Sequence, residues 1–305
     1  MRATFFSSLK ELYEEYNDIF VLTADLGFKL FDEIKIACPD RFYDIGVAES
    51  NTVGIASGLS LCGKNVYCYS IAPFLIMRAY EQVRIDVDYH DLNVKLVAVG
   101  GGFTYGFEGL THFGLEDLTL MTALQNMTVV VPADPIEASI LAKLSYEHKG
   151  PMYIRLGRTG ERVIHEDEPD FRIGKAMVLS EGKKVAIFAI GSMVLAAKEA
   201  ASILEKKGLA PTVVNLHTLK PIDVETIAGI ASSHEAIFSV EEHNIHGGLG
   251  SSLAEILLED GYKGIFKRIG IPGKLKEDIG DVNYLRNLYG LTAEKISETI
   301  LEELK

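Results

Sequence analysis

The chain has 305 residues, which is long enough for two domains with complete hydrophobic cores. Hydrophobic residues make up 48% of it and charged residues 24%, as in ordinary globular proteins. The net charge is −13 and the Lys and Arg residues are scattered, which argues against nucleic acid as the main partner because phosphate binding needs clustered positive charge.

The three cysteines, Cys38, Cys62 and Cys68, lack the spacing of metal ligands and indicate a reducing compartment with buried thiols. The first residues lead into an amphipathic pattern, not into the apolar run of a signal peptide. No apolar stretch reaches about 18 residues, so we expect no membrane span. These features predict a cytoplasmic protein that does not act at a membrane.

The first predicted elements alternate between helix and strand. Apolar residues at helical spacing predict a helix that ends at Asn17-Asp18, and residues 19–24 form the continuous apolar run of a strand covered on both faces. Asp25 follows at the carboxyl end of this strand, where open α/β sheets place ligand contacts. A turn-forming Asp at this position is equally consistent with the pattern.

Residues 44–59 predict a strand end, a turn and a helix rich in small residues that opens at Glu49. Gly46, Gly54 and Gly58 allow another backbone or a flat ligand to come close. Glu49 has two interpretations. It is either an ordinary carboxylate that complements the helix dipole, or a buried carboxylate that acts on a ligand.

A strand is predicted at residues 65–70, and a segment containing Phe74 follows it. A second strand at residues 94–99 runs into a Gly-rich loop, residues 100–112, which ends at His112. Such a loop at the carboxyl end of a strand is typical of a functional loop, although no Gly-Lys-Ser/Thr follows as in phosphate loops. A lone His is otherwise more often a surface or structural residue.

A strand at residues 125–131 precedes a helix that Asp134 is predicted to cap, with Pro135 in its first position. Residues 150–158 form a last strand that carries Arg155 and Arg158. Residues 161–170 are charged and show no period, as in a linker.

The second half again alternates strands with helices of 10 to 15 residues, which implies right-handed βαβ units and a mainly parallel sheet. Residues 218–223 are predicted to start a helix. Gly247-Gly248-Leu249-Gly250 lacks the order of a dinucleotide fingerprint. Glu242 and His243 are adjacent on a predicted strand and point to opposite faces, so they cannot chelate one ion and are expected instead to order a subunit interface or the next turn.

The predicted fold class is therefore α/β, with two consecutive domains that each have a mainly parallel sheet flanked by helices. We place the first domain at residues 1–165, a linker at 166–180 and the second domain at 181–305.

The run Ile-Gly-Val-Ala-Glu-Ser-Asn, followed by Gly-Ile-Ala-Ser-Gly-Leu, resembles the pyrimidine-binding domain of the transketolase family of thiamine diphosphate enzymes. Asn-Met…Val-Pro-Ala-Asp, Lys-Pro-Ile-Asp and Glu-Glu-His…Gly-Gly-Leu-Gly follow in the family's order, and the second half resembles the family's C-terminal domain. By this resemblance, Glu49 hydrogen-bonds N1′ of the cofactor's aminopyrimidine and activates it.

The resemblance also assigns cofactor contacts to Asp25, Ile71 and Phe74. Aromatic residues of the family stack on the aminopyrimidine, and Phe74 is the candidate here, with simple core packing as the alternative. Ile71 stands where the family often has an aromatic residue. Asp25 matches an Asp that the family often carries after the first strand.

The Gly-rich loop resembles the family's Gly-Glu-Asp-Gly-Pro-Thr-His loop, which contacts the substrate. His112 matches its His, suited to hydrogen-bond substrate oxygens or to transfer protons. Glu108 stands where the family has Asp, and Leu110 where it has Pro, which points to an unusual sugar. Arg158 matches an arginine that grips the substrate phosphate. Arg155 competes for that role, and a surface salt bridge is the alternative for Arg158.

The family binds the diphosphate and Mg²⁺ through a Gly-Asp-Gly motif in a separate N-terminal domain, and this chain lacks that motif. Gly280-Asp281-Val282-Asn283 is in the wrong domain and lacks the second Gly. We therefore expect no metal ligands from this chain, an N-terminal partner subunit that supplies them, and an α₂β₂ assembly containing a homodimer of this chain.

The predicted function is that of the C-terminal subunit of a split transketolase, a transferase that moves two-carbon ketol units between phosphorylated sugars. One alternative is a subunit like 1-deoxyxylulose-5-phosphate synthase or the beta chain of a 2-oxo-acid dehydrogenase. The beta chain has Gln-His-Ser in place of Gly-Leu-Thr-His, and the synthase is normally one long chain. A non-catalytic partner subunit is the remaining alternative.

Overall fold

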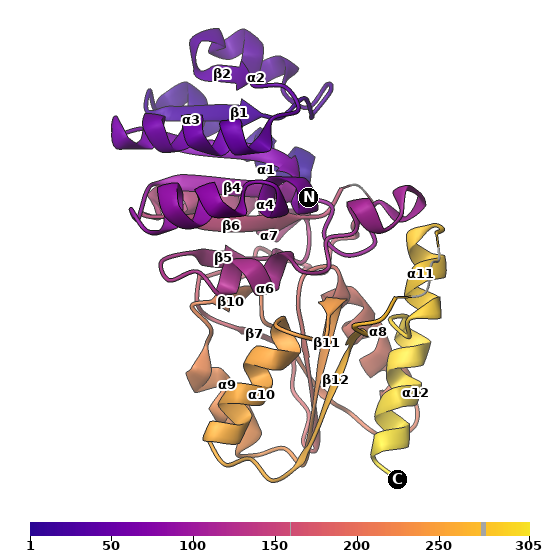
Figure 1. The fold of residues 1–305 in the computed structure, drawn as a ribbon. Helices are drawn as coiled ribbons and strands as arrows, with labels where there is room; N and C mark the ends of the chain where they lie inside the picture. Colours follow the sequence, from indigo (N-terminus) through magenta and orange to yellow (C-terminus); the bar gives the residue numbers. More distant parts are fainter. Residues whose placement is uncertain (159, 276–278) are drawn as a thin grey trace.

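The computed structural model describes residues 1–158, 160–275 and 279–305. It contains two sheets that lie one above the other, the first built mainly from the N-terminal half and the second from the C-terminal half (Figure 1). Helices cover both faces of each sheet. The α/β fold class with two mainly parallel sheets is confirmed.

The first sheet has seven strands in the order β10-β5-β6-β4-β3-β1-β2, and all its neighbouring pairs are parallel except β10 with β5. Its central strands are buried along their whole length, which explains why their residues are mostly apolar. The strands span β1 Ile19–Thr23, β2 Phe42–Asp44, β3 Asn65–Ile71, β4 Val94–Val99, β5 Thr128–Val130, β6 Met152–Leu156 and β10 Thr218–Lys220.

Apolar residues on one face of the first sheet pack against α1 and α7, and those on the other face pack against α3, α4 and α6. The helical segments of this half span α1 Arg2–Glu15, α2 Asp32–Ala37, η1 Pro39–Arg41, α3 Glu49–Leu61, α4 Ala72–Met77, α5 Tyr80–Gln82, the π-helix η2 Val83–Asp88, η3 Gly106–Glu108, η4 Leu110–His112, α6 Asp117–Thr122 and α7 Pro135–Glu147. The predicted cap of α7 is confirmed, since the Asp134 side chain accepts a hydrogen bond from the Glu137 N–H.

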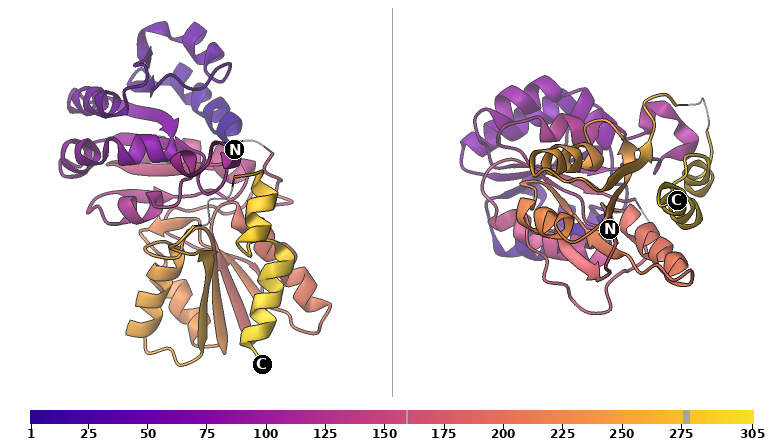
Figure 2. Two further views of the ribbon diagram at one scale, coloured as in Figure 1. Left: turned by 45° about the vertical axis from the view of Figure 1, so that its right-hand side comes forward. Right: turned by 90° about the horizontal axis from the view of Figure 1, so that it is seen from below.

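The second sheet has five strands in the order β12-β11-β8-β9-β7, and only β7 is antiparallel to its neighbour. Helices α9 and α10 cover one face, while α8 and α12 cover the other (Figure 2). The elements of this half span β7 Met177–Ser180, β8 Val185–Ala189, α8 Met193–Glu205, β9 Thr212–Asn215, α9 Val224–Ala231, β11 Ala236–Asn244, α10 Leu249–Glu259, β12 Ile265–Ile271, α11 Val282–Leu288 and α12 Ala293–Glu303.

Strand β10 ties the two halves together. The prediction that residues 218–223 start a helix is wrong for Thr218–Lys220, which instead form an edge strand of the first sheet. The helix α9 begins only after Asp223, whose side chain caps it. Apolar periodicity did not reveal this, because the strand is only three residues long and pairs with a sheet far away in the sequence.

One hydrophobic cluster runs through both halves without interruption. It joins Val53 and Met121 from helices of the first half to Phe188 and Val214 from strands of the second half. The last four residues of the stretch expected as a linker, Met177–Ser180, form β7 at the edge of the second sheet. Within the described residues, no helix is long and apolar enough to span a membrane.

Candidate active site at the carboxyl edge of the first sheet

The predicted site residues all follow the carboxyl ends of strands in the first sheet. Asp25 comes after β1, Glu49 after β2, Ile71 and Phe74 at the end of β3, the Gly-rich loop after β4, and Arg158 after β6. These strands are parallel to one another, so their carboxyl ends meet along one edge. This is the edge where open α/β sheets bind ligands.

Glu49 is the first residue of α3 and is buried, with only 4% of its surface exposed. Its Oε2 lies 3.3 Å from Nη1 of Arg78, and its Oε1 accepts a long hydrogen bond of 3.5 Å from the Ser70 hydroxyl. A buried carboxylate usually has short, strong partners. Both contacts here are long, so the carboxylate retains capacity to accept a hydrogen bond from a ligand.

A row of side chains in contact extends from Glu49 across the edge of the sheet. The guanidinium of Arg78 lies 4.1 Å from the ring centroid of Phe74, and the Phe74 ring meets His112 in a T-shaped contact with centroids 4.8 Å apart. His112 in turn lies 5.9 Å from the ring of Tyr105, over which Arg158 is placed at 4.9 Å. Three of the residues proposed from the sequence, Phe74, His112 and Arg158, are thus brought into one contiguous row with Glu49.

The Gly-rich loop needs its glycines to hold this row. Gly100 has a φ of +91°, and a Cβ on it would lie 2.2 Å from the Tyr105 ring. A side chain at this position would therefore displace Tyr105, which separates His112 from Arg158. His112 is half-buried at the end of the loop, and its Nδ1 is 2.9 Å from the Thr111 hydroxyl, so Nε2 is the ring nitrogen not used in this contact.

The three other proposed residues lie outside this row. Asp25 is exposed with φ +54°, and its backbone N–H donates to the Asp44 carboxylate. Ile71 is 7% exposed and packs in the core beneath the edge, as the last residue of β3. Glu108 is exposed on the outer turn of the Gly-rich loop. Their assigned roles in cofactor and substrate binding stay predictions.

Arg155 in β6 and Arg158 just after it have different environments. Arg155 is 6% exposed, with Nε 2.9 Å from a carboxylate oxygen of Asp117 and Nη2 donating to the Gly114 carbonyl. Arg158 is exposed and borders a pocket of about 490 Å³ between the two halves of the chain. Arg155 lines the same pocket, but it is buried and its guanidinium is engaged with Asp117 and Gly114, so Arg158 is the more accessible of the two arginines.

Sequence reasoning missed Arg78 and Tyr105. Arg78 follows Phe74 by four residues in a helical segment, and that spacing alone predicts that the two side chains meet. Tyr105 is an aromatic residue within a loop of glycines, where a large side chain has a packing role by default.

Glu242 and His243 lie inside the interface between the two halves of this chain. Burial alone would raise the pKa of Glu242, but the Arg286 guanidinium, 2.7 Å away, holds it below its usual value. Burial lowers the pKa of His243 to about 4, and its Nε2 faces Asp117 at 3.8 Å. The preceding residue Glu241, which sequence reasoning did not single out, accepts the backbone N–H groups that open α10.

The aminopyrimidine of thiamine diphosphate fits the residues at Glu49. Such a ring needs a carboxylate for its ring nitrogen and a flat apolar surface for its face. Glu49 offers the carboxylate and Phe74 offers the flat surface. Arg78 contacts both side chains, which shows that they lie near each other. The Gly280–Asn283 stretch does not offer a diphosphate site, because Asp281 caps α11 by accepting from the Tyr284 N–H.

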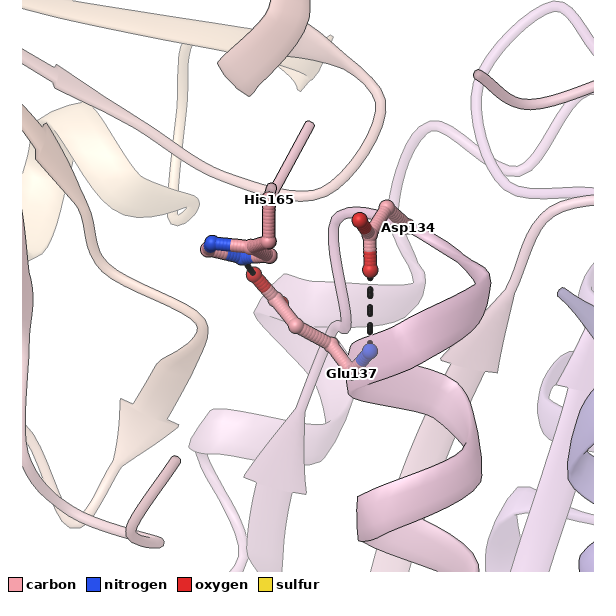
Figure 3. A group of neighbouring side chains, drawn as sticks. All are labelled: Asp134, Glu137 and His165. Carbon is pink, nitrogen blue, oxygen red and sulfur yellow. Dashed lines mark hydrogen bonds and ion pairs between the residues drawn. The ribbon is translucent and has the colours of Figure 1, made fainter. Parts of the chain in front are cut away.

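A buried group of Asp134, Glu137 and His165 has the residue types of a metal site, and Figure 3 shows the three side chains converging. The carboxylate oxygens of Asp134 and Glu137 already have hydrogen-bond partners. Asp134 accepts from the backbone N–H groups of Glu137 and Ile164, at 2.8 and 2.9 Å. Glu137 accepts from the Ala133 N–H through one oxygen and lies 2.6 Å from His165 through the other.

The same Glu137 oxygen accepts a hydrogen bond of 2.7 Å from the amide of Asn215 in β9. The group therefore joins α7 of the first half, the connecting segment and the second sheet. Burial raises the pKa of Glu137, while its contact with His165 acts in the opposite direction. With these donors in place, the geometry is that of a hydrogen-bonded clamp between the halves.

His217, next to this clamp, is expected to make folding sensitive to acid. It is fully buried, stacks on Phe171 at 3.9 Å, and burial, with a smaller contribution from His165, lowers its pKa to about 3. An unfolded His titrates near pH 6.5, so the stability that depends on the neutral ring is complete above that pH. It is lost as the pH falls towards 3, by about 1.4 kcal/mol per pH unit.

The variant His217→Phe keeps the stacked ring and removes this titration. We expect its unfolding free energy to fall less steeply than that of the wild type between pH 6.5 and 4.5, by about 2 kcal/mol over the window. Urea unfolding at pH 7.5, 6.5, 5.5 and 4.5 measures both slopes. Parallel curves would show that His217 does not remain neutral in the folded protein.

Comparisons with known proteins agree with this arrangement. The family profile described as "Transketolase, pyrimidine binding domain" matches residues 1–161, and "Transketolase, C-terminal domain" matches residues 174–296. The chain is 37% identical to a "Putative transketolase C-terminal section" of Methanocaldococcus jannaschii, over 100% of this chain and 96% of that protein. It is 35% identical to one of the subunits of an apulose-4-phosphate transketolase of Phocaeicola vulgatus, over 100% of this chain and 97% of that one.

A solved structure titled "Split gene transketolase, inactive beta4 tetramer" superposes with a TM-score of 0.91 at 38% identity, covering 99% of this chain and 97% of that chain. The first half carries the pyrimidine-binding domain, the second half carries the C-terminal domain, and both match along their lengths. This chain belongs to the transketolase family.

Proposed function

We propose that the chain is the C-terminal subunit of a split, thiamine-diphosphate-dependent transketolase that moves a two-carbon ketol unit between phosphorylated sugars. The observation that carries the proposal is the contiguous row from Glu49 through Phe74 and His112 to Arg158. The relatives that match the chain from end to end are themselves named as a C-terminal section and as a transketolase subunit, which supports the split arrangement.

When bound, the cofactor supplies the carbon nucleophile that carries the ketol unit. Glu49 would hold the proton at the ring nitrogen of the aminopyrimidine, and its burial would keep water from competing for that contact. Phe74 would present its ring as the stacking surface. The protein thereby orients and tunes the cofactor.

His112 and Arg158 would handle the substrate. The Nε2 of His112, which the contact with Thr111 leaves unused, can donate to a sugar oxygen or accept a proton from it. The guanidinium of Arg158 is exposed and can form paired hydrogen bonds with a phosphate. One relative is named for apulose-4-phosphate, a phosphorylated sugar, which is consistent with phosphate binding by Arg158.

The partner would be an N-terminal subunit that supplies the diphosphate site and the Mg²⁺ ligands, in an α₂β₂ assembly with two copies of this chain. Mg²⁺ requires oxygen ligands in octahedral geometry together with the phosphates. The Asp281 carboxylate, the chain's nearest match to the family's motif, already caps a helix.

Reconstitution tests the proposal. The chain is purified alone and in complex with the N-terminal subunit, and each sample receives thiamine diphosphate, Mg²⁺ and a panel of phosphorylated and unphosphorylated ketose donors. We expect the complex, but not the isolated chain, to transfer a ketol unit from a phosphorylated donor. Turnover by the isolated chain would contradict the split arrangement, and carbon dioxide release from pyruvate would favour the synthase or dehydrogenase alternative.

A further inference from the structure

The contact between Arg78 and Glu49 is unusual for an ion pair at the surface. Glu49 is 4% exposed, whereas the side chain of Arg78 is 49% exposed. The long arginine side chain thus reaches from solvent to a buried carboxylate. Its backbone is held at this place, because the Arg78 carbonyl accepts a hydrogen bond of 2.8 Å from the Ser50 hydroxyl on the first turn of α3.

The guanidinium of Arg78 makes two contacts at once. One N–H edge faces the Glu49 carboxylate at 3.3 Å, and its plane lies over the Phe74 ring at 4.1 Å. A guanidinium is flat, carries N–H donors at its edge and stacks on aromatic rings. Those are the chemical features with which an aminopyrimidine would meet the same carboxylate and the same ring.

We propose that Arg78 is a stand-in for the cofactor's aminopyrimidine, holding Glu49 and Phe74 in the subunit without cofactor and leaving them when the cofactor binds. This inference rests on the proposed function, since it takes Glu49 and Phe74 as the aminopyrimidine site. Two flat groups cannot occupy the space between one carboxylate and one ring, so binding requires the Arg78 side chain to swing out. Its half-exposed position gives it room to do so.

Two consequences follow for the subunit. The buried carboxylate has a charged partner before the cofactor arrives, so the empty site avoids an uncompensated charge. The same partner opposes cofactor binding, because breaking the Glu49–Arg78 pair lowers the apparent affinity. Arg78 is thus a positioning residue whose contact is autoinhibitory.

The test compares Arg78→Gln with wild type in the complex with the N-terminal subunit. Thiamine diphosphate is titrated in the presence of Mg²⁺, and its Kd and association rate are measured by calorimetry and stopped flow. We expect Arg78→Gln to bind about 3- to 10-fold more tightly and to associate faster, in line with the loss of one partly exposed ion pair. Arg84→Gln is the matched control, since Arg84 is an exposed arginine in the π-helix η2.

Equal or weaker binding by Arg78→Gln would overturn the proposal, because the arginine would then be neutral or favourable to the bound state. A shift of the same size in Arg84→Gln would assign the effect to net charge and overturn it as well. If the wild-type complex fails to bind the cofactor at all, the proposed function fails first, which is a separate outcome. Thermal unfolding of each variant checks that the fold is intact, and Arg78→Met replaces Arg78→Gln if that variant is unstable.

Discussion

Replacing Glu49 with Gln is expected to lower the turnover of the two-subunit enzyme by about 10³-fold, within the range for loss of a general acid–base group. Gln is close to Glu in size. Its amide oxygen can still accept from Arg78, and its NH2 group can donate to the Ser70 hydroxyl, so the packing at the start of α3 should survive. It cannot hold a proton at the cofactor's ring nitrogen. The loss should therefore fall on kcat, while the Kd of thiamine diphosphate changes much less.

The measurements are steady-state ketol transfer and deuterium exchange at C2 of the bound cofactor, which reports activation without a sugar. Glu81→Gln is the control, because Glu81 is exposed on the short helix α5 and lies outside the row of side chains in contact. Far-UV circular dichroism and thermal unfolding establish that both variants fold. A Glu49→Gln enzyme with wild-type turnover and exchange would refute the assigned role of this carboxylate.

The sequence predicted the layered α/β fold well because the central strands are buried on both faces. Runs such as residues 94–99 are apolar apart from Lys95 and buried throughout, and few other structures tolerate such runs between polar turns. It did not predict β10, since three residues that pair across the domain boundary leave no local pattern. Strand β7 was obscured for a related reason, because it is only partly buried and its apolar residues do not stand out from a linker.

Four of the residues proposed from the sequence lie together in the candidate site, but the contacts that join them were not predicted. The resemblance to the family proposed Glu49, Phe74, His112 and Arg158, and the structure brings them into one row, while their roles stay predictions. The links between them, Arg78 and Tyr105, depend on side-chain directions that only tertiary packing decides. For Arg155 and Arg158 the sequence could not choose, because both are arginines on or beside the same strand.

Arg155 is buried and Arg158 is exposed, so we expect their replacement to affect different properties, folding stability for Arg155 and substrate binding for Arg158. Arg155→Met is expected to destabilise folding by about 3–5 kcal/mol, because it leaves Asp117 buried without its cationic partner. Asp117 is fully buried, and its remaining close partner is the Tyr153 hydroxyl at 2.5 Å. Urea unfolding at neutral pH should show the loss as a lower midpoint with an unchanged slope.

Arg158→Met should instead leave folding stability nearly unchanged and impair substrate binding. Its side chain is exposed, so its unfolding free energy should stay within about 0.5 kcal/mol of the wild type. The KM for a phosphorylated donor should rise about 10- to 100-fold, as expected from the loss of one or two charge-assisted hydrogen bonds. Donors without a phosphate should be unaffected, and Arg162→Met, which removes an exposed arginine paired with Glu199, is the matched control. If Arg155→Met folded with wild-type stability and raised the KM instead, the phosphate would be bound by the buried Arg155. The assignment of phosphate binding to Arg158 would then be wrong.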